Sequence, residues 1–240
     1  MHVGFILDGN GRWAASKSLP RSIGHKKGAE NVEAILKTCK NLGIASVTLY
    51  AFSTENWSRP VFEVKALMKL FHYYLKKKLT MLYQENVKVV IIGDINPFPK
   101  VIKDYIKNLE ELTKNNDGMC LNLAMNYGGR SEIVKATKEI VRAISDGIIR
   151  INDIDEYLFS QYLYTHGQND PDLIIRTAGE KRLSNFLLWQ SAYSELYFVE
   201  KNWPDFTQSD LVEALNYFNS RKRKFGSLET VEKSVRNRVS

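Results

Sequence analysis

The chain has 240 residues, of which 44% are hydrophobic, and these values predict one globular domain with an ordinary core. Its formal net charge of +7 favours an anionic partner, which leaves nucleic acid, an acidic membrane surface and a phosphorylated substrate open. Cys39 and Cys120 have no CxxC spacing, so neither a disulfide framework nor a zinc site is indicated. No apolar run approaches the ~18 residues of a membrane span. We therefore expect a cytoplasmic protein.

The hydrophobic pattern alternates between two kinds of element along the chain. Apolar runs typical of buried strands occur at residues 3–7, 46–52, 87–93, 119–127 and 172–177. Amphipathic stretches between them predict helices at residues 28–42, 62–83, 103–114, 131–144 and 154–163. This alternation predicts an α/β fold: a single domain over residues 1–240, with a mostly parallel central sheet flanked by helices and a basic tail from about residue 221.

Three of the predicted strands lead directly into polar clusters, at residues 8–12, 53–59 and 176–184. Each cluster contains arginine and at least one carboxylate. The carboxyl ends of parallel strands share one edge of a sheet, so we expect the clusters to converge there. Guanidinium groups beside glycine, serine and asparagine suit phosphate oxygens, which they bind in pairs.

A carboxylate at such an anion site is consistent with a bound Mg²⁺, which commonly joins one or two carboxylates to substrate phosphates. Asp8 is the first candidate ligand, because it follows the first strand directly. Glu195 is the second candidate, because it is the only acidic residue within residues 186–198. The alternative for Glu195 is an exposed position on a turn between a helix and a strand.

Other interpretations of these residues remain open. Gly9-x-Gly11-x-x-Ala14 matches a dinucleotide fingerprint, but Pro20 and Gly24 interrupt the residues after it and the second strand ends only near residue 52. A glycine turn with a surface Asp8 would need no ligand, and arginines are usually solvated. The net charge leaves a nucleic-acid-binding protein as a second class of function, and a non-catalytic partner subunit as a third.

The predicted helix at residues 62–83 is apolar over a wider arc than one core-facing side requires. It either packs between the sheet and a subunit or lines an apolar channel. We expect an apolar tunnel between sheet and helices, with Ala51 near its mouth and Met119 at its floor.

Four segments together resemble the cis-prenyltransferases, specifically the undecaprenyl diphosphate synthase (isoprenyl transferase) family. They are residues 2–14 (HVGFILDGNGRWA), 49–60 (LYAFSTENWSRP), 126–130 (NYGGR) and 174–198, and the resemblance extends from residue 2 to about residue 226. It implies Mg²⁺-dependent condensation of isopentenyl diphosphate with an allylic diphosphate, usually farnesyl diphosphate, into a long cis-polyprenyl diphosphate. It further implies that the product is the undecaprenyl lipid carrier of peptidoglycan and cell-wall synthesis. The enzyme would be a cytoplasmic homodimer that contacts the inner membrane face peripherally through its lipid product, and it would have no nucleic-acid partner.

The resemblance also implies roles for individual residues. Asp8 is the catalytic, metal-binding carboxylate, Glu195 completes the metal site, and Asn56 is assigned to proton removal. As an amide, Asn56 is a poor base, so orienting the substrate or relaying a proton to a diphosphate oxygen suits it better. Ala178 departs from the glycine or serine of many members, which should leave Arg176 in place. The substrate-binding positions are Gly9, Asn10, Gly11, Arg12, Trp13, Arg21, His25, Ser53, Thr54 and Glu55 for the allylic diphosphate, Trp57 and Arg59 in a mobile lid, and Arg176, Arg182, Leu183 and Ser184 for isopentenyl diphosphate.

Overall fold

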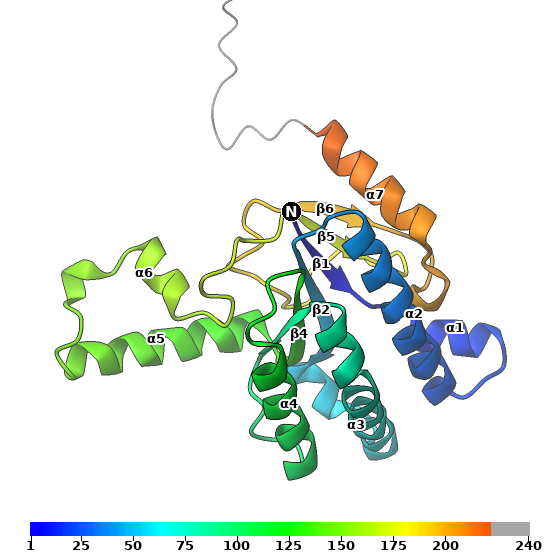
Figure 1. Cartoon of the computed structure of the whole chain (residues 1–240), viewed down its shortest axis with the longest axis horizontal. Coiled ribbons are helices and arrows are strands. Elements are labelled where there is room, and N and C mark those ends of the chain that lie inside the picture. The colour runs from blue at the N-terminus through cyan, green and yellow to red at the C-terminus, as the bar shows by residue number, and fades with distance from the viewer. Residues whose placement is uncertain (222–240) are drawn as a thin grey trace, which may run out of the picture.

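The computed structural model describes residues 1–221, apart from the side chains of residues 78–80, so the predicted basic tail lies outside the described residues. The described chain forms one sheet in the order β3-β4-β2-β1-β5-β6, and every pair of neighbouring strands is parallel (Figure 1). This confirms the predicted α/β architecture. The strands are β1 (His2–Ile6), β2 (Ser46–Ser53), β3 (Lys88–Ile92), β4 (Cys120–Tyr127), β5 (Leu173–Arg176) and β6 (Glu195–Phe198).

Five of these strands lie where the apolar runs predict them, because strands covered on both faces need apolar residues at successive positions. Residues 2–6 of β1, for example, are all buried. The sequence analysis did not assign β6, whose four residues are only partly buried at the edge of the sheet. An edge strand shows a weaker apolar signal than a central one.

The main helices cover the predicted stretches, and two others were not predicted. The predicted ones are α2 (Arg21–Asn41), α3 (Val61–Gln84), α4 (Lys100–Thr113), α5 (Gly129–Ser145) and α6 (Glu156–Gln161). The additional helices are α1 (Asn10–Ser16), which follows Gly9 directly, and α7 (Gln208–Ser220).

Two expectations about residues 9–28 were wrong. A short helix does follow the glycine fingerprint, and α2 begins at Arg21, seven residues before the predicted start. Pro20 immediately precedes α2 rather than interrupting it, since proline is compatible with a helix start. Gly24 lies inside α2, where a Cβ would meet the carbonyl oxygen of Asn10 at 2.0 Å. Glycine at this position therefore allows α1 and α2 to pack closely.

The two faces of the sheet are covered differently. The larger apolar cluster includes Val3, Phe5 and Leu173, and residues from α2, α3, α4 and α7 pack into it. The smaller cluster covers the opposite face of the same strands and includes Ile6, Ile174 and Phe186. α5 and α6 project away from the sheet as an arm (Figure 1). None of the helices in the described part of the chain is both long and apolar enough to cross a bilayer.

Candidate active site

The three predicted polar clusters meet at one edge of the sheet. Strands β2, β1 and β5 are direct neighbours, and Ile6 is in register with Tyr50 on one side and with Arg176 on the other. The residues that follow these positions therefore lie together at the carboxyl ends of the strands, where α/β sheets bind their ligands.

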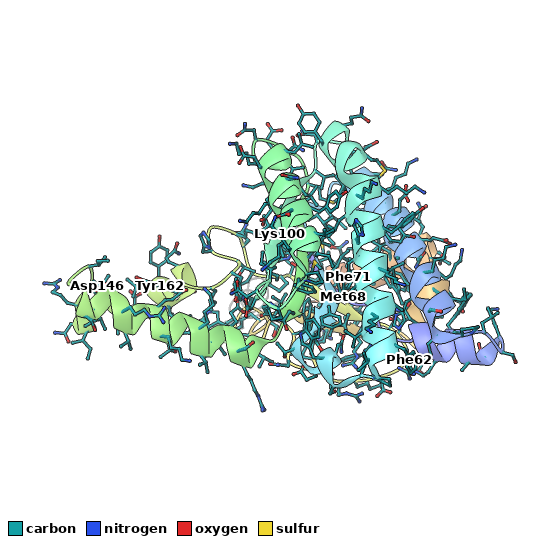
Figure 2. All side chains as sticks on the ribbon, turned by 90° about the horizontal axis from the view of Figure 1, so that it is seen from below. Phe62, Met68, Phe71, Lys100, Asp146 and Tyr162 are labelled. Carbon is teal, nitrogen blue, oxygen red and sulfur yellow. The ribbon has the colours of Figure 1, made fainter. Side chains whose placement is uncertain are left out.

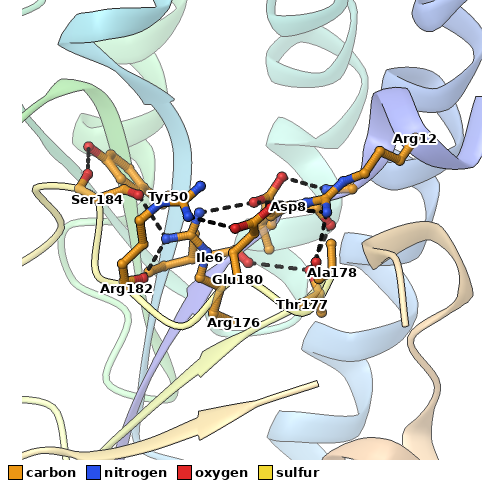
Figure 3. A network of polar contacts seen from close by, with 12 residues as sticks. Ile6, Asp8, Arg12, Tyr50, Arg176, Thr177, Ala178, Glu180, Arg182 and Ser184 are labelled. Carbon is orange, nitrogen blue, oxygen red and sulfur yellow. Dashed lines mark hydrogen bonds and ion pairs between the residues drawn. The ribbon is translucent and has the colours of Figure 1, made fainter. Parts of the chain in front are cut away.

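Asp8 occupies the centre of this edge, between two arginines (Figure 3). Its Oδ2 lies 3.0 Å from Nη2 of Arg176 and 3.3 Å from Nη2 of Arg12, and its Oδ1 accepts a hydrogen bond from the Gly9 N–H at 2.7 Å. Burial raises the pKa of Asp8, but the hydrogen bonds from Arg176 and Gly9 and the two guanidinium charges outweigh it, so the pKa lies below its ordinary value. Asp8 is therefore ionised at neutral pH.

Arg176 is the most enclosed cation of the site, with 4% of its surface exposed. Its Nη1 donates to Oγ of Ser184 at 2.7 Å and to the carbonyl oxygen of Arg182. Its Nε is buried and has no hydrogen-bond partner among the described residues. A buried donor without an acceptor is uncommon in folded proteins and is consistent with a ligand oxygen that this guanidinium would bind.

Glu180 links two arginines that the family resemblance assigns to different diphosphates. Its Oε1 lies 3.2 Å from Nη1 of Arg12 and its Oε2 lies 2.5 Å from Nη1 of Arg182. Arg12 also donates to the carbonyl oxygen of Ala178 at 2.8 Å. Ala178 has a left-handed backbone with φ 71°, a conformation that glycine adopts more easily.

The segment after β2 forms a short 3₁₀ helix, η1 (Thr54–Ser58). Ser53 caps it, and the Ser53 N–H donates to Oδ1 of Asn56 at 3.2 Å. Glu55 accepts a hydrogen bond from Nδ2 of Asn185 at 2.9 Å. Burial raises the pKa of Glu55, but this and further hydrogen bonds outweigh it and leave the pKa below its ordinary value.

A second cationic cluster surrounds Glu63, which the sequence analysis did not identify. Glu63 is 6% exposed and lies 3.3 Å from Nε of Arg21, 3.3 Å from Nε2 of His25 and 3.1 Å from Nη1 of Arg59. Burial lowers the pKa of His25, and the charges of Arg59 and Arg21 lower it further against the effect of Glu63. His25 is therefore neutral at pH 7. The spacing of Arg59 and Glu63, four residues apart at the start of a helix, is a signal for this pair.

A cavity of about 680 Å³ begins at this edge and continues between the sheet and α2, α3 and α4. Its deeper wall is apolar and includes Phe71 of α3, which Figure 2 shows next to Met68. Ala51 lines the cavity as expected, whereas Met119 does not, although it belongs to the same buried cluster as Leu109 and Leu121 of the wall. The predicted site residues that line it are Asp8, Asn10, His25, Ser53, Glu55, Asn56, Arg59, Arg176 and Ser184.

The other predicted site residues lie outside this lining. Trp13 is buried and its Nε1 donates to Oδ1 of Asp205 at 2.7 Å, so it attaches α1 to the 3₁₀ helix η3 (Trp203–Asp205). Leu183 packs against the smaller apolar cluster. The remaining ones are Gly9, Gly11, Arg12, Arg21, Thr54, Trp57, Arg182 and Glu195.

Glu195 does not share an end of the sheet with Asp8. It begins β6 in register with Leu173, whereas Arg176, at the Asp8 end, is in register with Phe198. The level of Glu195 in the sheet is three strand residues, or ~10 Å, away from the level of Arg176. The Oε2 of Glu195 lies 3.4 Å from Nε of Arg221 instead. Among the described residues, no group of three or more His, Cys, Asp or Glu side chains could hold a metal ion.

The site therefore combines a cationic end with a long apolar interior. Arginines and one ionised carboxylate surround the opening, and aliphatic and aromatic side chains line the rest. This combination fits a ligand with an anionic phosphate head and a hydrocarbon tail, and it defines an α/β protein with a binding site for a lipid phosphate.

Comparisons with known proteins give the family. Residues 6–226 match the model of the Prenyltransf family, described as "Putative undecaprenyl diphosphate synthase". The chain is 52% identical over 230 residues to an isoprenyl transferase of Prochlorococcus marinus, covering 96% of this chain and 85% of that protein. It is 47% identical to a ditrans,polycis-undecaprenyl-diphosphate synthase of Buchnera aphidicola described as (2E,6E)-farnesyl-diphosphate specific, covering 95% of this chain and 91% of that protein.

A solved structure agrees with this assignment. Lavandulyl diphosphate synthase from Lavandula x intermedia, in complex with dimethylallyl diphosphate, superposes with a TM-score of 0.91 at 40% identity, covering 94% of this chain and 98% of that one. The chain belongs to the undecaprenyl diphosphate synthase family and is a cis-prenyltransferase.

Proposed function

We propose that this cis-prenyltransferase condenses isopentenyl diphosphate with farnesyl diphosphate and repeats the step to build the undecaprenyl carrier of cell-wall synthesis. The observation that supports the proposal is the cavity of about 680 Å³, which is cationic at its mouth and apolar in its interior. A diphosphate head fits the arginines, and each methylene of the chain gains ~0.8 kcal/mol when the interior removes it from water. The apolar part of the cavity then serves as the tunnel for the growing product.

The two diphosphates would bind on either side of Asp8. Arg12 and Arg21, with the backbone of residues 9–11, flank the allylic side. Arg176, Arg182 and Ser184 form the isopentenyl side, where the buried Nε of Arg176 still lacks an acceptor. Binding of a diphosphate would compete with Glu180 for the guanidinium groups that it joins.

The chemistry follows from the charge at this edge. The allylic C–O bond breaks, the diphosphate leaves with its electron pair, the double bond of isopentenyl diphosphate attacks the allylic carbon, and a proton is then lost. Preorganised arginines stabilise the negative charge of the departing diphosphate. Asn56 faces the cavity and orients the isopentenyl group or relays the proton to a diphosphate oxygen, since an amide does not titrate near neutral pH.

Asp8 is the residue that would hold Mg²⁺. Its carboxylate is ionised, lines the cavity and lies at a site that suits phosphate oxygens, which are the other ligands that Mg²⁺ takes at such sites. The ion, when bound, neutralises diphosphate charge. Glu195 of the same chain lies at the other end of the strands and would not share that ion with Asp8.

We further propose that the enzyme is a cytoplasmic homodimer that contacts the membrane peripherally when it delivers its lipid product. The support for the dimer is the arm of α5 and α6, which projects from the body with Asp146 near its outer end (Figure 2). Large apolar side chains are exposed along it, namely Val134, Val141, Ile148, Ile151 and Tyr157. Apolar surface of this kind commonly marks an interface.

One assay tests the proposed reaction. Purified protein is incubated with farnesyl diphosphate, labelled isopentenyl diphosphate and Mg²⁺, with a matched sample in excess chelator, and products are separated by chain length. We expect long polyprenyl diphosphates in the first sample and none in the second. Retention of oligonucleotides at physiological salt without any prenyl transfer would contradict the proposal and favour the nucleic-acid alternative.

A further inference from the structure

Trp57 does not line the cavity, unlike Glu55 and Asn56 of the same 3₁₀ turn. Residues three apart are eclipsed in a 3₁₀ helix, and Ser53, Asn56 and Arg59 all line the cavity at this spacing. Trp57 lies on another face of the same turn, and it is absent from the described residues that line the cavity. Its ring packs edge-on against Phe52, with the ring centroids 5.0 Å apart.

The polar end of the Trp57 ring contacts Asn126. Trp57 Nε1 donates to Oδ1 of Asn126 at 2.8 Å. Asn126 is the penultimate residue of β4 and is 6% exposed. Its Nδ2 donates to the carbonyl oxygen of Asp94 at 2.6 Å. Because the oxygen and the nitrogen of the amide each have a partner, the Asn126 side chain has one fixed orientation.

The backbone around Asn126 is also specialised for this contact. Asn126 has φ 49°, in the left-handed region that few residues other than glycine and asparagine tolerate inside a strand. Directly after the neighbouring strand β3, Gly93 has φ 122°, and a Cβ there would meet the carbonyl oxygen of Met125 at 2.1 Å. Glycine at position 93 therefore allows the segment with Asp94 to approach β4 closely enough to bind the Asn126 amide. Strained residues of this kind cluster at functional sites.

We propose that Asn126 is a positioning residue that holds η1 in place through Trp57 and thereby sets the position of Asn56 and Arg59 at the cavity mouth. A 3₁₀ turn of five residues has little stability of its own, so contacts with the body must fix it. Asn126 supplies a contact on a face of η1 that does not line the cavity, so the position of Asn56 is held by a group outside the space that a substrate would occupy. The importance of this position for catalysis rests on the proposed function; the attachment itself does not.

The test separates the side chain of Asn126 from its backbone. Asn126→Gly keeps the left-handed backbone and removes both hydrogen bonds. Asn126→Asp keeps the acceptor for Trp57 and loses the donor to Asp94, and serves if the glycine variant does not fold. Asn122→Ala is the matched control: Asn122 is a fully buried asparagine of the same strand, but it bonds to Thr48 and Gln168 near the opposite end of the strand.

Hydrogen exchange followed by mass spectrometry on the substrate-free chain gives a readout that does not depend on activity. We expect residues 53–59 to exchange about tenfold faster in Asn126→Gly, as the loss of a buried hydrogen bond predicts. Asn126→Asp should lie between wild type and glycine. Asn122→Ala should lower the melting temperature without changing exchange of residues 53–59. Unchanged exchange in both Asn126 variants, or equal acceleration in Asn122→Ala, would overturn the proposal.

Kinetics give the second readout. In the prenyl-transfer assay, kcat/KM should fall about tenfold in Asn126→Gly and in Trp57→Phe, which keeps the ring and loses the N–H. The double variant should fall no further, because both changes remove the same contact. Additive losses would contradict coupling through Trp57. Absence of prenyl transfer in the wild type would refute the proposed function alone, because the exchange experiment would still decide whether Asn126 holds η1.

Discussion

Asp8 and Arg176 show how a small set of charges is held ready at the end of two strands. Each neutralises the other in the described chain, at 3.0 Å, and each retains capacity for a further partner: Asp8 lines the cavity and Arg176 has a free buried Nε. A site built in this way is organised before the substrate arrives, so little reorganisation accompanies binding.

Replacing Asp8 with alanine should therefore remove activity and leave the fold intact. We expect turnover to fall by at least ~10²-fold at saturating Mg²⁺, as for the loss of one preorganised electrostatic group. The melting temperature should fall, because the buried Arg176 loses the carboxylate that neutralises it, but the protein should still fold, because the Asp8 side chain lies at the edge of the sheet and is 31% exposed. Steady-state kinetics and thermal unfolding on Asp8→Ala and on Asp8→Asn, which keeps the size, would check this. Turnover near wild type in both variants would refute the role of Asp8.

The two arginines assigned to isopentenyl diphosphate should respond differently to lysine. Arg176 is 4% exposed and holds Ser184, so Arg176→Lys should lower stability and raise the KM for isopentenyl diphosphate about tenfold. The Arg182 side chain is 60% exposed, so Arg182→Lys should raise that KM with little change in stability. Initial rates with each substrate varied in turn, alongside melting curves, separate the two effects. A rise confined to the KM of the allylic substrate would show that the two diphosphate sites are exchanged.

The site residues that could be predicted from the sequence differ from those that could not in where their contact partners lie along the chain. Asp8, Ser53 and Arg176 follow apolar strands directly, and a parallel sheet brings such positions together without further information. Glu63 contacts Arg21 and Asn126 contacts Trp57, and because these partners are far away in the sequence, only the folded chain shows the two contacts. Glu195 was placed beside Asp8 because β6 and its register were not predicted.

At the scale of elements, the same distinction separates the central strands from the short elements around them. Continuous apolar runs predicted β1 to β5, whereas α1 and the first seven residues of α2 were missed because Pro20 and Gly24 were interpreted as helix breakers. The contact of Gly24 with Asn10, which makes glycine the suitable residue there, joins two helices and has no signature in the local sequence.

The packing of α3 and α4 against β2 and β4 should set product length. Ala51 lines the cavity on β2, which ends at the catalytic edge, and Leu109 and Leu121 line it toward the start of β4. Ala51→Leu should block the path and shorten the products, whereas Leu109→Ala should deepen the cavity and lengthen them. We also expect Met119→Ala to lengthen them, because Met119 belongs to the same buried cluster, although it does not line the cavity.

Chain-length analysis of the products would test this arrangement, with Leu211→Ala of α7 as the matched control. Leu211 is fully buried but does not line the cavity, so its truncation should destabilise the protein by a comparable ~2–5 kcal/mol without changing product length. The same product distribution in Ala51→Leu and Leu109→Ala, with activity retained, would exclude this path for the chain.

At the scale of the whole molecule, the two ends of the sheet carry different kinds of polar group. The carboxyl end gathers charges that are partly exposed, whereas the amino end holds a network of hydroxyl, amide and imidazole groups, with the Asp172 carboxylate accepting from the His2 backbone N–H. His2 lies at the centre of that network: its Nε2 is 2.7 Å from Oγ1 of Thr48 and its Nδ1 is 2.8 Å from the carbonyl oxygen of Asn169. Asn122 and Gln168 extend the network across β4. These bonds join β1, β2, β4 and the segment before β5.

Stability should consequently depend on pH through His2. The side chain is 2% exposed, and burial lowers the pKa of His2 below its ordinary 6.5, against the opposing effects of Asn169 and Asp172. The unfolded chain then binds more protons than the folded one below pH 6.5, so the free energy of unfolding is greatest above that pH and falls as the pH drops through 6.5 toward the lowered value. The lowered pKa of His25 adds to the same trend.

Denaturant unfolding between pH 8 and 5 would measure this dependence in the wild type, in His2→Gln and in His25→Gln as the matched comparison. His2→Gln should be less stable at pH 8, because it loses network hydrogen bonds, yet its stability should decline less steeply below pH 6.5. Asp8 and Glu55 should not contribute to the change between pH 8 and 5. Carboxylates with lowered pKa values lose their contribution to the free energy of unfolding only as the pH falls below their ordinary range near 4. Parallel curves for wild type and His2→Gln would show that His2 does not titrate on unfolding, and the buried network would then be stable to protonation.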